Sequence, residues 1–395
     1  MLTERIDNIK GDRILIAPLN WGLGHASRSS SIINELISRG KHVIIATDGI
    51  VADYFTAEYP GLEQVHLPGI RVQYSKSNSQ VGAMLRQSPK FLLSIYREHA
   101  KLGELIGELN IDTVISDNRF GAWCNKCHCI YISHQLMIKM PPYFKWAEKM
   151  VWRAHKWFYN HYDEVWIPDN DDEYNLSGDL SHKYPISKKC HFIGVLSRFN
   201  NYSTDYNKGN ISNSFLGKNS LIDTSKRFDD IEKVVIISGP EPARSMMESW
   251  ALNFSSFNSH KLKTLIICGK PGNDNTPCTC TSSALNCNIA CSVNTTGINS
   301  SGVSAVKIVN DYTLCVNHLP TAEIAFYLLH AREIVCRSGY STIMDLYSLG
   351  ILQNERVNIS FIPTPGQTEQ EYLALHIKQR FDNDDLNRIN ILNIN

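Results

Sequence analysis

The sequence lacks any excess of charge, because 39 lysines and arginines balance 39 aspartates and glutamates over 395 residues. Without a net positive field, we expect no binding to nucleic acid. The chain also lacks an apolar run of roughly 18 residues, so no transmembrane helix is predicted. Residues 1–11 are polar, which predicts no signal peptide. The chain has eleven cysteines, and without a signal peptide these are expected to be reduced thiols. These features together predict a cytoplasmic protein.

No internal repeat is present, but strand-like and helix-like stretches alternate in both halves of the chain. The expected strands are 13–19, 42–47, 112–116, 129–133, 164–167, 233–238, 262–268, 306–309, 333–336 and 358–362, and the expected helices are 26–38, 51–58, 85–109, 143–160, 243–251, 321–331, 341–349 and 367–380. This length and pattern predict two doubly wound, Rossmann-like α/β domains that face each other across a cleft. The boundaries are placed at 1–195 for the N-terminal domain, 196–230 for a polar linker, 231–380 for the C-terminal domain and 381–395 for a tail.

The first strand runs into a glycine turn and then a helix. Gly22 and Gly24 form the turn, and His25 follows it. Free backbone N–H groups and the positive end of the helix favour an anion above this turn. His25 adds a group that can accept a proton near neutral pH.

Two other interpretations of this turn remain open. A dinucleotide-binding loop needs a third glycine where Ser27 stands, although Asp48 follows the second strand and could hold a ribose. The turn could also be an ordinary strand–helix connection that needs small residues.

Further polar residues follow other strands of the first half. Asp117 and Arg119 come after the strand at 112–116, and His134 comes after the strand at 129–133. Because ligands of open parallel sheets bind at the carboxyl ends of strands, we expect these side chains on the same rim as His25.

In the second half, residues 336–345 read Cys-Arg-Ser-Gly-Tyr-Ser-Thr-Ile-Met-Asp. Hydroxyls and N–H groups at a helix start suit a diphosphate, and Asp345 could reach a pair of sugar hydroxyls. Residues 363–370 read Pro-Thr-Pro-Gly-Gln-Thr-Glu-Gln and could hold pyranose hydroxyls. Gly239 could approach a phosphate, and residues 317–320 could flank a base. An ordinary helix cap explains each segment when it is taken alone.

Together, Gly22 to His25, Cys336 to Asp345 and Pro363 to Gln370 resemble family 28-type glycosyltransferases of the GT-B fold. That family includes the UDP-GlcNAc transferase that forms lipid II and uncharacterised relatives with a family 28 C-terminal domain. The resemblance covers both halves in order. It departs at residues 238–244, where Ser-Gly-Pro-Glu-Pro-Ala-Arg replaces a glycine-rich loop.

The resemblance implies that His25 lies near the acceptor hydroxyl as the catalytic base, with Asp117 and His134 as rivals. A UDP-sugar is the expected co-substrate, with no other cofactor and no metal, since helix N-termini and arginines can hold the leaving diphosphate. The expected nucleotide-sugar-binding residues are Gly22, Gly24, Gly239, Arg244, His318, Leu319, Arg337, Ser338, Gly339, Ser341, Thr342, Asp345, Gln367, Glu369 and Gln370.

These features predict an inverting transferase that moves a hexosyl or N-acetylhexosaminyl group to an unknown acceptor, such as a lipid-linked or cell-envelope glycan. The alternatives are a UDP-sugar hydrolase like that of pseudaminic acid synthesis, a non-hydrolysing epimerase and a nucleotide-sugar sensor without turnover. Basic and aromatic residues at 139–162 predict either a peripheral contact with the inner face of the membrane or a helix that covers the sheet.

Three groups of metal-binding residue types are interpreted as structural. The run from Asp169 to Asp172 resembles an Asp-x-Asp metal motif but is assigned to a solvated loop. The spacing of Cys278, Cys280, Cys287 and Cys291 fits no standard zinc pattern. Residues 124–129 contain three cysteines and a histidine at a strand start, where alternation would point neighbouring side chains apart and prevent a closed site.

Overall fold

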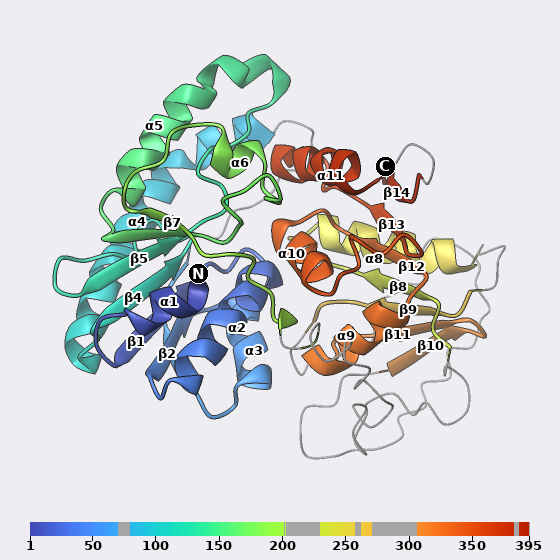
Figure 1. Cartoon of the computed structure of the whole chain (residues 1–395), viewed down its shortest axis with the longest axis horizontal. Helices are drawn as coiled ribbons and strands as arrows, with labels where there is room; N and C mark the ends of the chain where they lie inside the picture. The colour runs from blue at the N-terminus through green and yellow to red at the C-terminus, as the bar shows by residue number, and fades with distance from the viewer. Residues whose placement is uncertain are drawn as a thin grey trace. The chain divides into compact units, whose positions relative to one another are not determined.

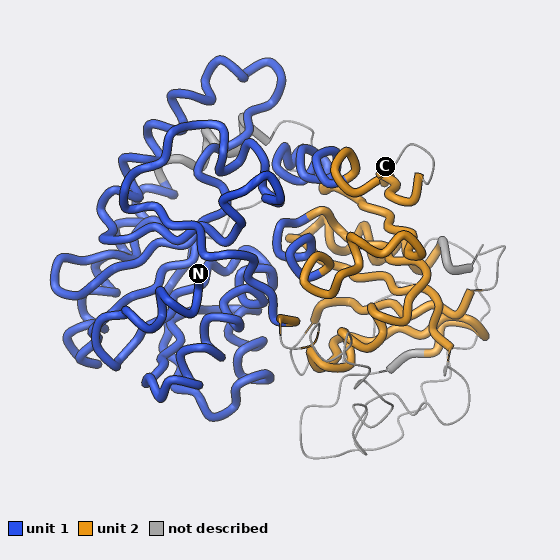
Figure 2. Tube along the Cα trace, in the orientation of Figure 1, with its two compact units in different colours: residues 1–198, 339–345, 365–377 blue, residues 199–338, 346–364, 378–395 orange. Residues whose placement is uncertain are grey.

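The computed structural model describes residues 1–69, 80–200, 202, 230–256, 262–270, 306–382 and 387–394. It divides into two compact units (Figure 2). Unit 1 contains residues 1–198, 339–345 and 365–377, and unit 2 contains residues 199–338, 346–364 and 378–395. The expected linker lies outside the described residues at 201 and 203–229, as does the cysteine-containing loop at 271–304.

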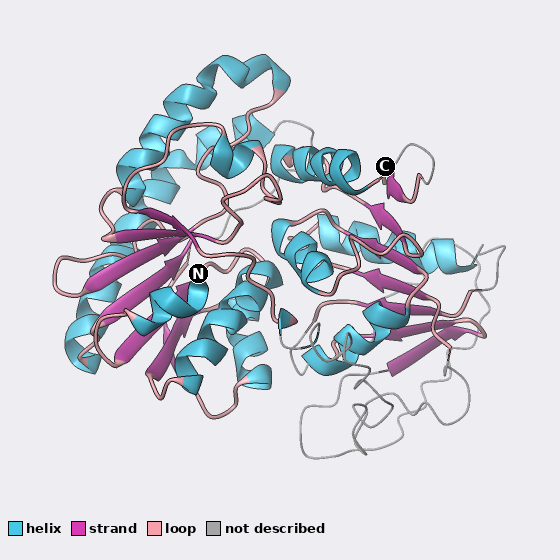
Figure 3. Cartoon of the chain, in the orientation of Figure 1, coloured by secondary structure: helices cyan, strands magenta, loops and turns pink. Residues whose placement is uncertain are grey.

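Unit 1 is built on a parallel seven-stranded sheet in the order β3-β2-β1-β4-β5-β6-β7. Helices accompany these strands along the chain (Figures 1 and 3). The strands are β1 (Arg13–Pro18), β2 (His42–Thr47), β3 (Glu63–His66), β4 (Thr113–Asp117), β5 (His128–Ile132), β6 (Glu164–Ile167) and β7 (Cys190–Phe192). The helices are α1 (Leu2–Asp7), α2 (Leu23–Ser38), α3 (Gly49–Glu58), α4 (Gln80–Leu109), the 3-10 helix η1 (Pro142–Ala147), α5 (Glu148–Tyr159) and α6 (Asp179–His182).

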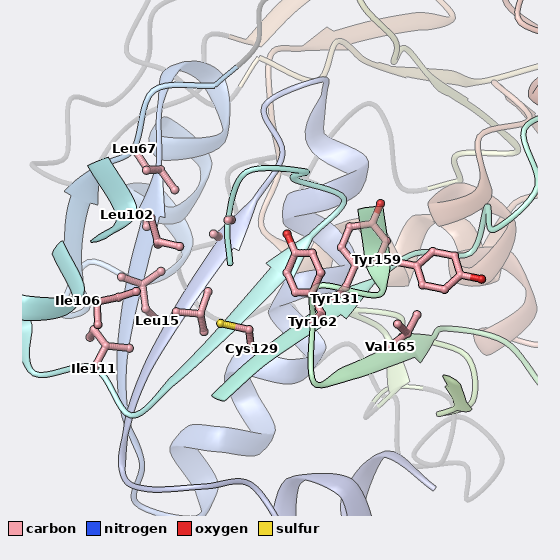
Figure 4. Packing of buried hydrophobic residues seen from close by; sticks show 14 of the residues in the cluster. Leu15, Leu67, Leu102, Ile106, Ile111, Cys129, Tyr131, Tyr159, Tyr162 and Val165 are labelled. Carbon is pink, nitrogen blue, oxygen red and sulfur yellow. The ribbon is translucent and has the colours of Figure 1, made fainter. Parts of the chain in front are cut away.

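The strands in the middle of this sheet are continuous apolar runs because both of their faces are covered. Leu15 of β1 and Tyr131 of β5 are fully buried, and they belong to one cluster with Leu102 and Ile106 of α4 (Figure 4). Apolar side chains on α4 therefore anchor this helix to the sheet, while the polar residues remain at the strand ends.

Unit 2 repeats the arrangement, with strand order β10-β11-β9-β8-β12-β13-β14. Only the edge pair β10–β11 is antiparallel among the described strands. The strands are β8 (Lys233–Ile236), β9 (Thr264–Ile267), β10 (Val306–Asn310), β11 (Thr313–Val316), β12 (Glu333–Cys336), β13 (Asn358–Phe361) and β14 (Ile389–Ile391). The helices are α8 (Ala243–Ser256), α9 (Thr321–His330), α10 (Tyr340–Ser348) and α11 (Thr368–Phe381), and the starts of α10 and α11 belong to unit 1.

The structure confirms the predicted α/β class and every predicted strand to within two residues at each end. The expected helix at 143–160 is divided into η1 and α5. Four short strands, β3, β7, β11 and β14, were not expected. The last of them lies in the expected tail at 381–395 and pairs with β13. Among the described residues, no helix is long and apolar enough to cross a bilayer.

Each sheet has a switch point, where consecutive crossovers leave in opposite directions along the sheet. In unit 1 it lies between β1 and β4, where Pro18 is paired with Asp117. In unit 2 it lies between β8 and β12, where Ile236 is paired with Cys336. The polar segments expected to bind ligand come directly after these strands.

Candidate active site

The turn after β1 places His25 in the first turn of α2. Gly22 precedes the helix with a φ of 132°, a backbone conformation that side chains rarely allow. Helix α2 begins at Leu23, three residues earlier than predicted. His25 therefore lies at the amino end of this helix and at the carboxyl end of β1, as expected for a group above the switch point.

Asp117, the last residue of β4, is fully buried and faces this turn. Its Oδ1 lies 3.1 Å from Nδ1 of His25. Arg28, one helical turn after His25, donates from Nε to Asp117 Oδ2 over 2.7 Å and from Nη2 to Asp117 Oδ1. Nη2 of Arg28 also lies 2.8 Å from Nδ1 of His25. These three side chains form one buried cluster.

The same arginine connects this cluster to His134. Nη1 of Arg28 lies 3.1 Å from Nδ1 of His134, and Nε2 of His134 lies 2.7 Å from Oε1 of Glu369 in α11. The ring of Tyr340 stacks on His134 with a centroid distance of 4.1 Å and an interplanar angle of 2°. All of these residues belong to unit 1.

Burial and neighbouring charges set the protonation of the cluster. Burial lowers the pKa of His25, and the charge of Asp117 opposes that shift while the charge of Arg28 adds to it. Burial alone would raise the pKa of Asp117, but Arg28 and then His25 outweigh it and lower that pKa. Burial alone would raise the pKa of Glu369, but its interactions with His134, Arg28 and His25 together outweigh burial and lower that pKa. Asp117 and Glu369 are therefore carboxylates at neutral pH, and His25 is neutral.

Two segments that are distant in sequence meet beside the glycine turn in unit 1. Ser341 donates its hydroxyl to the carbonyl oxygen of Gly24 over 2.8 Å. A Cβ at Gly24 would lie 3.0 Å from that hydroxyl, so a side chain at residue 24 would crowd Ser341. Asp345, one turn later, is buried and accepts a hydrogen bond of 2.6 Å from the hydroxyl of Ser197. Burial raises the pKa of Asp345, and Arg198 opposes that shift.

The remaining predicted residues of unit 1 lie at the starts of α10 and α11. Gly339 precedes α10, and Thr342 is half-buried in its first turn. Gln370 donates from Nε2 to Oε1 of Gln367 over 2.6 Å, so these two amides are bonded to each other. The hydroxyl of Thr368 donates to the carbonyl oxygen of Lys139 over 2.7 Å, which holds the start of α11 within unit 1.

In unit 2, Arg337 follows β12 and is buried. It donates to the carbonyl oxygens of Ile362, Pro363 and Ala243 at 3.0, 3.1 and 2.6 Å. Burial lowers its pKa to about 10, so it remains a cation at neutral pH. Its partners among the described residues are carbonyls, so no carboxylate in that part of the chain cancels its charge.

Arg244 differs from Arg337 in this respect. It forms ion pairs with Glu241 at 2.6 Å and with Glu248 at 3.0 Å, so its charge is locally balanced. The other residues predicted in unit 2 lie in loops after strands. Gly239 has a φ of 101° in the turn after β8, Ser338 is buried after β12, Leu319 is buried, and His318 is half-buried.

Several residues of the cluster were missed by sequence reasoning. Arg28 connects the two histidines, and its only signal was its position three residues after His25. Tyr340, Ser197 and Arg198 carried no signal in the sequence, because their roles depend on contacts between distant segments.

Two interpretations of charged residues were wrong. Arg119 is not on the rim but buried beneath it, where it pairs with Glu98 at 2.5 Å and donates to the carbonyl oxygens of Ala46 and Leu67. Asp169 is not solvated but fully buried. It accepts hydrogen bonds from the backbone N–H groups of residues 170, 176 and 177, which fold the loop around it.

Neither a protein-family model nor a curated protein sequence matches the chain. Among solved structures, it resembles the spinosyn rhamnosyltransferase SpnG with a TM-score of 0.50 and 13% identity, over 92% of this chain and 84% of that chain. It also aligns with the glycotransferase of kitacinnamycin (TM-score 0.49, 15% identity, 97% and 86%). A third alignment is with a UDP-GlcNAc 2-epimerase from Neisseria meningitidis bound to UDP-GlcNAc (TM-score 0.49, 12% identity, 96% and 95%). The likeness to SpnG shows the predicted GT-B fold.

Proposed function

We propose that this protein is an inverting glycosyltransferase that moves a hexosyl or N-acetylhexosaminyl group from a UDP-sugar to an acceptor hydroxyl. The observation that carries the proposal is the position of His25. It lies at the switch point of the first sheet, at a helix start, and directly against the buried carboxylate of Asp117. The choice of UDP rests on the resemblance of residues 336–345 and 363–370 to family 28 sequences.

The hydrogen bonds favour His25 over its two rivals as the base. Both ring nitrogens of His134 are engaged, one by Arg28 and one by Glu369. Both oxygens of Asp117 are engaged by Arg28, and its lowered pKa makes it a weak base. Within the described part of the chain, Nε2 of His25 has no hydrogen-bond partner, so it is available to an acceptor hydroxyl.

The base role requires one tautomer of His25. In that tautomer Nδ1 carries the proton and donates it to Oδ1 of Asp117, which leaves the lone pair on Nε2. Nη2 of Arg28, 2.8 Å from Nδ1, then donates to Asp117 and not to His25. As the acceptor oxygen attacks the anomeric carbon, its proton moves to Nε2 and the bond to the UDP oxygen breaks. Asp117 then stabilises the imidazolium that forms, as a carboxylate does for a catalytic histidine elsewhere.

The leaving UDP carries negative charge that must be stabilised. Arg337 offers a buried positive charge at the switch point of the second sheet, and the turns before α8 and α10 offer backbone N–H groups. We therefore assign the leaving-group role to Arg337 rather than to Arg244, whose charge is balanced by Glu241 and Glu248. This assignment requires no metal ion and no cofactor besides the donor.

The test is to incubate the purified chain with UDP-, GDP- and dTDP-sugars, with and without pools of lipid-linked and free glycans. The assay measures the released nucleoside diphosphate. We expect acceptor-dependent release of UDP that His25→Gln abolishes while donor binding, measured by calorimetry, is retained. His42→Gln, at an exposed position at the start of β2, is the matched control. Absence of binding to every nucleotide sugar would overturn the proposal.

A second candidate is a non-hydrolysing UDP-sugar epimerase. The cluster holds a second acid–base pair, His134 with Glu369, beside the pair His25 with Asp117. Elimination and re-addition of a nucleotide need two separate proton transfers, which two such pairs could supply once the substrate displaces Glu369 from Nε2 of His134. In the same assay, a product with inverted configuration and deuterium incorporated at a ring carbon would favour the epimerase. Release of UDP that no acceptor accelerates would favour the hydrolase.

A lipid-linked acceptor is favoured by the surface of η1 and α5. Tyr143, Trp146 and Met150 are 90%, 72% and 62% exposed, and the exposed Lys145 and Lys149 lie among them. Exposed aromatic rings between lysines suit the headgroup region of an anionic membrane. We propose that the protein is cytoplasmic and binds peripherally to the inner face of the membrane through this surface.

Co-sedimentation with vesicles tests this surface. We expect binding to vesicles with anionic lipid that weakens in salt and is lost in Lys145→Glu/Lys149→Glu. The double variant Lys188→Glu/Arg356→Glu makes the same change in net charge at other exposed positions and is expected to bind normally. Equal loss in both variants would show that only net charge matters, which contradicts a defined surface.

A further inference from the structure

Three cysteines converge at the end of the first sheet opposite to the candidate active site. Cys124 and Cys127 lie in the connection between β4 and β5, and Cys129 is the second residue of β5 (Cys129 is labelled in Figure 4). The Sγ atoms of Cys124 and Cys127 are 3.3 Å apart, and those of Cys127 and Cys129 are 3.8 Å apart. All three sulfurs lie within 4.8 Å of one another.

This convergence overturns the expectation that strand alternation would separate the side chains. Cys127 and Cys129 are two residues apart, so they share a face, and the loop brings Cys124 back to them. His128 does point away, since its ring nitrogens lie 3.4 Å from Asp163 and 3.1 Å from Glu164. The donor set is therefore three sulfurs without the histidine.

The backbone around the sulfurs is arranged to stabilise negative charge on them. The N–H of Cys124 donates to Sγ of Cys129 over 3.3 Å, and the N–H of Lys126 donates to Sγ of Cys124 over 3.2 Å. Hydrogen bonds of this kind to sulfur are typical of the surroundings of thiolate ligands. Cys124 and Cys127 are only half-buried, which leaves a path for an ion to enter.

We propose that Cys124, Cys127 and Cys129 bind one thiophilic d10 cation, Zn²⁺ or Cu⁺, through three thiolates. Thiolates select these ions over harder cations. With Zn–S bonds of about 2.3 Å, ligand sulfurs in a tetrahedral site are roughly 3.8 Å apart, close to the separations in this cluster. Each protonated thiol releases its proton to solvent as its metal–sulfur bond forms. For Zn²⁺, a water molecule or an external ligand completes the fourth position.

The site would have a structural effect on the candidate active site. The connection that contains Cys124 and Cys127 begins directly after Asp117 and carries Arg119. A metal bound to all three sulfurs would fasten the far end of this connection to β5. This proposal does not depend on the glycosyltransferase activity, since it concerns the opposite end of the sheet.

Metal content of the purified full-length chain tests the proposal. The chain is reduced, stripped of metal, offered Zn²⁺ or Cu⁺ under anaerobic conditions and dialysed. The background carries serine at positions 278, 280, 287 and 291, so that these four cysteines do not contribute, and Cys268→Ser removes the contribution of the Cys268 and Cys315 sulfurs, which are 3.3 Å apart. We expect one equivalent of metal, lost in Cys127→Ser and retained in the matched control Cys190→Ser, a single buried cysteine of the same unit. Competition between the two ions identifies which of them is preferred.

A second measurement needs no cysteine variant in the cluster and guards against misfolding. Alkylation followed by peptide mass spectrometry should show Cys124, Cys127 and Cys129 protected by the bound metal and modified after chelation. Co²⁺ as a probe should give a thiolate-to-cobalt charge-transfer band. The proposal would be overturned if the chain retained neither Zn²⁺ nor Cu⁺. It would also be overturned if Cys127→Ser left the amount of bound metal unchanged. Formation of a disulfide between Cys124 and Cys127 in place of metal binding would also overturn it.

Discussion

Arg28 lies against Asp117 in a two-point ion pair, with Nε donating to Oδ2 over 2.7 Å and Nη2 donating to Oδ1. Both side chains are almost completely buried. The remaining N–H groups of the guanidinium reach His25 and His134. This single arginine therefore lies against the carboxylate and both histidines, and its planar fork is what allows three side chains to surround it.

Replacement of Arg28 by Met should destabilise the protein strongly. It leaves Asp117 buried without its cation, and breaking a buried ion pair in this way costs about 3–5 kcal/mol. The free energy of unfolding, measured in urea, should fall by that amount. Arg39→Met is the control, because Arg39 pairs with Asp7 and Glu35 at the surface, where solvent screens an ion pair and its loss changes the free energy of unfolding little. Similar losses in the two variants would contradict the central position of Arg28.

Replacement of His25 by Gln should lower kcat without a comparable change in donor affinity. The variant keeps a polar side chain but cannot accept a proton, and loss of a general base typically costs roughly 10²–10⁴-fold. Steady-state kinetics with saturating acceptor measures the effect. His134→Gln should act differently, since both ring nitrogens of His134 bind protein groups, and we expect a larger change in KM than in kcat. Equal kcat losses in the two variants would leave His134 as a rival base.

The pH dependence of kcat/KM should show an acid limb below pH 6.5. Burial lowers the pKa of His25, so its neutral form persists as the pH falls and activity is lost only when the pH drops through the lowered pKa. Asp117 raises that pKa and Arg28 lowers it. Asp117→Asn removes the raising charge and keeps the lowering one, so the acid limb should move to still lower pH as the maximal rate falls. A shift to higher pH would contradict the assigned interactions.

The fold was predictable from the sequence because each central strand is a continuous apolar run next to an amphipathic helix. The short strands β3, β7, β11 and β14 escaped prediction for a physical reason. They contain only three or four residues, which is too short for a clear pattern, and in β3, β7 and β14 several side chains are also exposed or half-buried. Their pairing therefore depends on the neighbouring strand rather than on their own pattern.

The candidate site was predictable only in part. His25, Asp117 and His134 each follow a strand, so the rule for parallel sheets was sufficient to place them on one edge. Arg119 follows the same rule and yet is buried, because Glu98 of α4 supplies a buried carboxylate that the sequence pattern does not reveal. The three cysteines near β5 show the same limit, since the path of a loop rather than strand alternation brings Cys124 to the others.

The affinity for UDP should depend on Arg337 far more than on Arg244. Arg337→Met removes a cation that no carboxylate of the described residues balances, and we expect about tenfold weaker UDP binding, or about 1.4 kcal/mol. Arg244→Met removes a cation paired with Glu241 and Glu248, so UDP binding should change less than about twofold. A loss of UDP affinity could come from a lost contact with the diphosphate or from displaced loops. Calorimetric titration with UDP and with uridine separates these two explanations. Uridine lacks the diphosphate, so its affinity should be the same in the Arg337 variant and the unaltered protein. A parallel loss for uridine would mean that Arg337 acts only by holding the loops after β8 and β13 through its carbonyl partners.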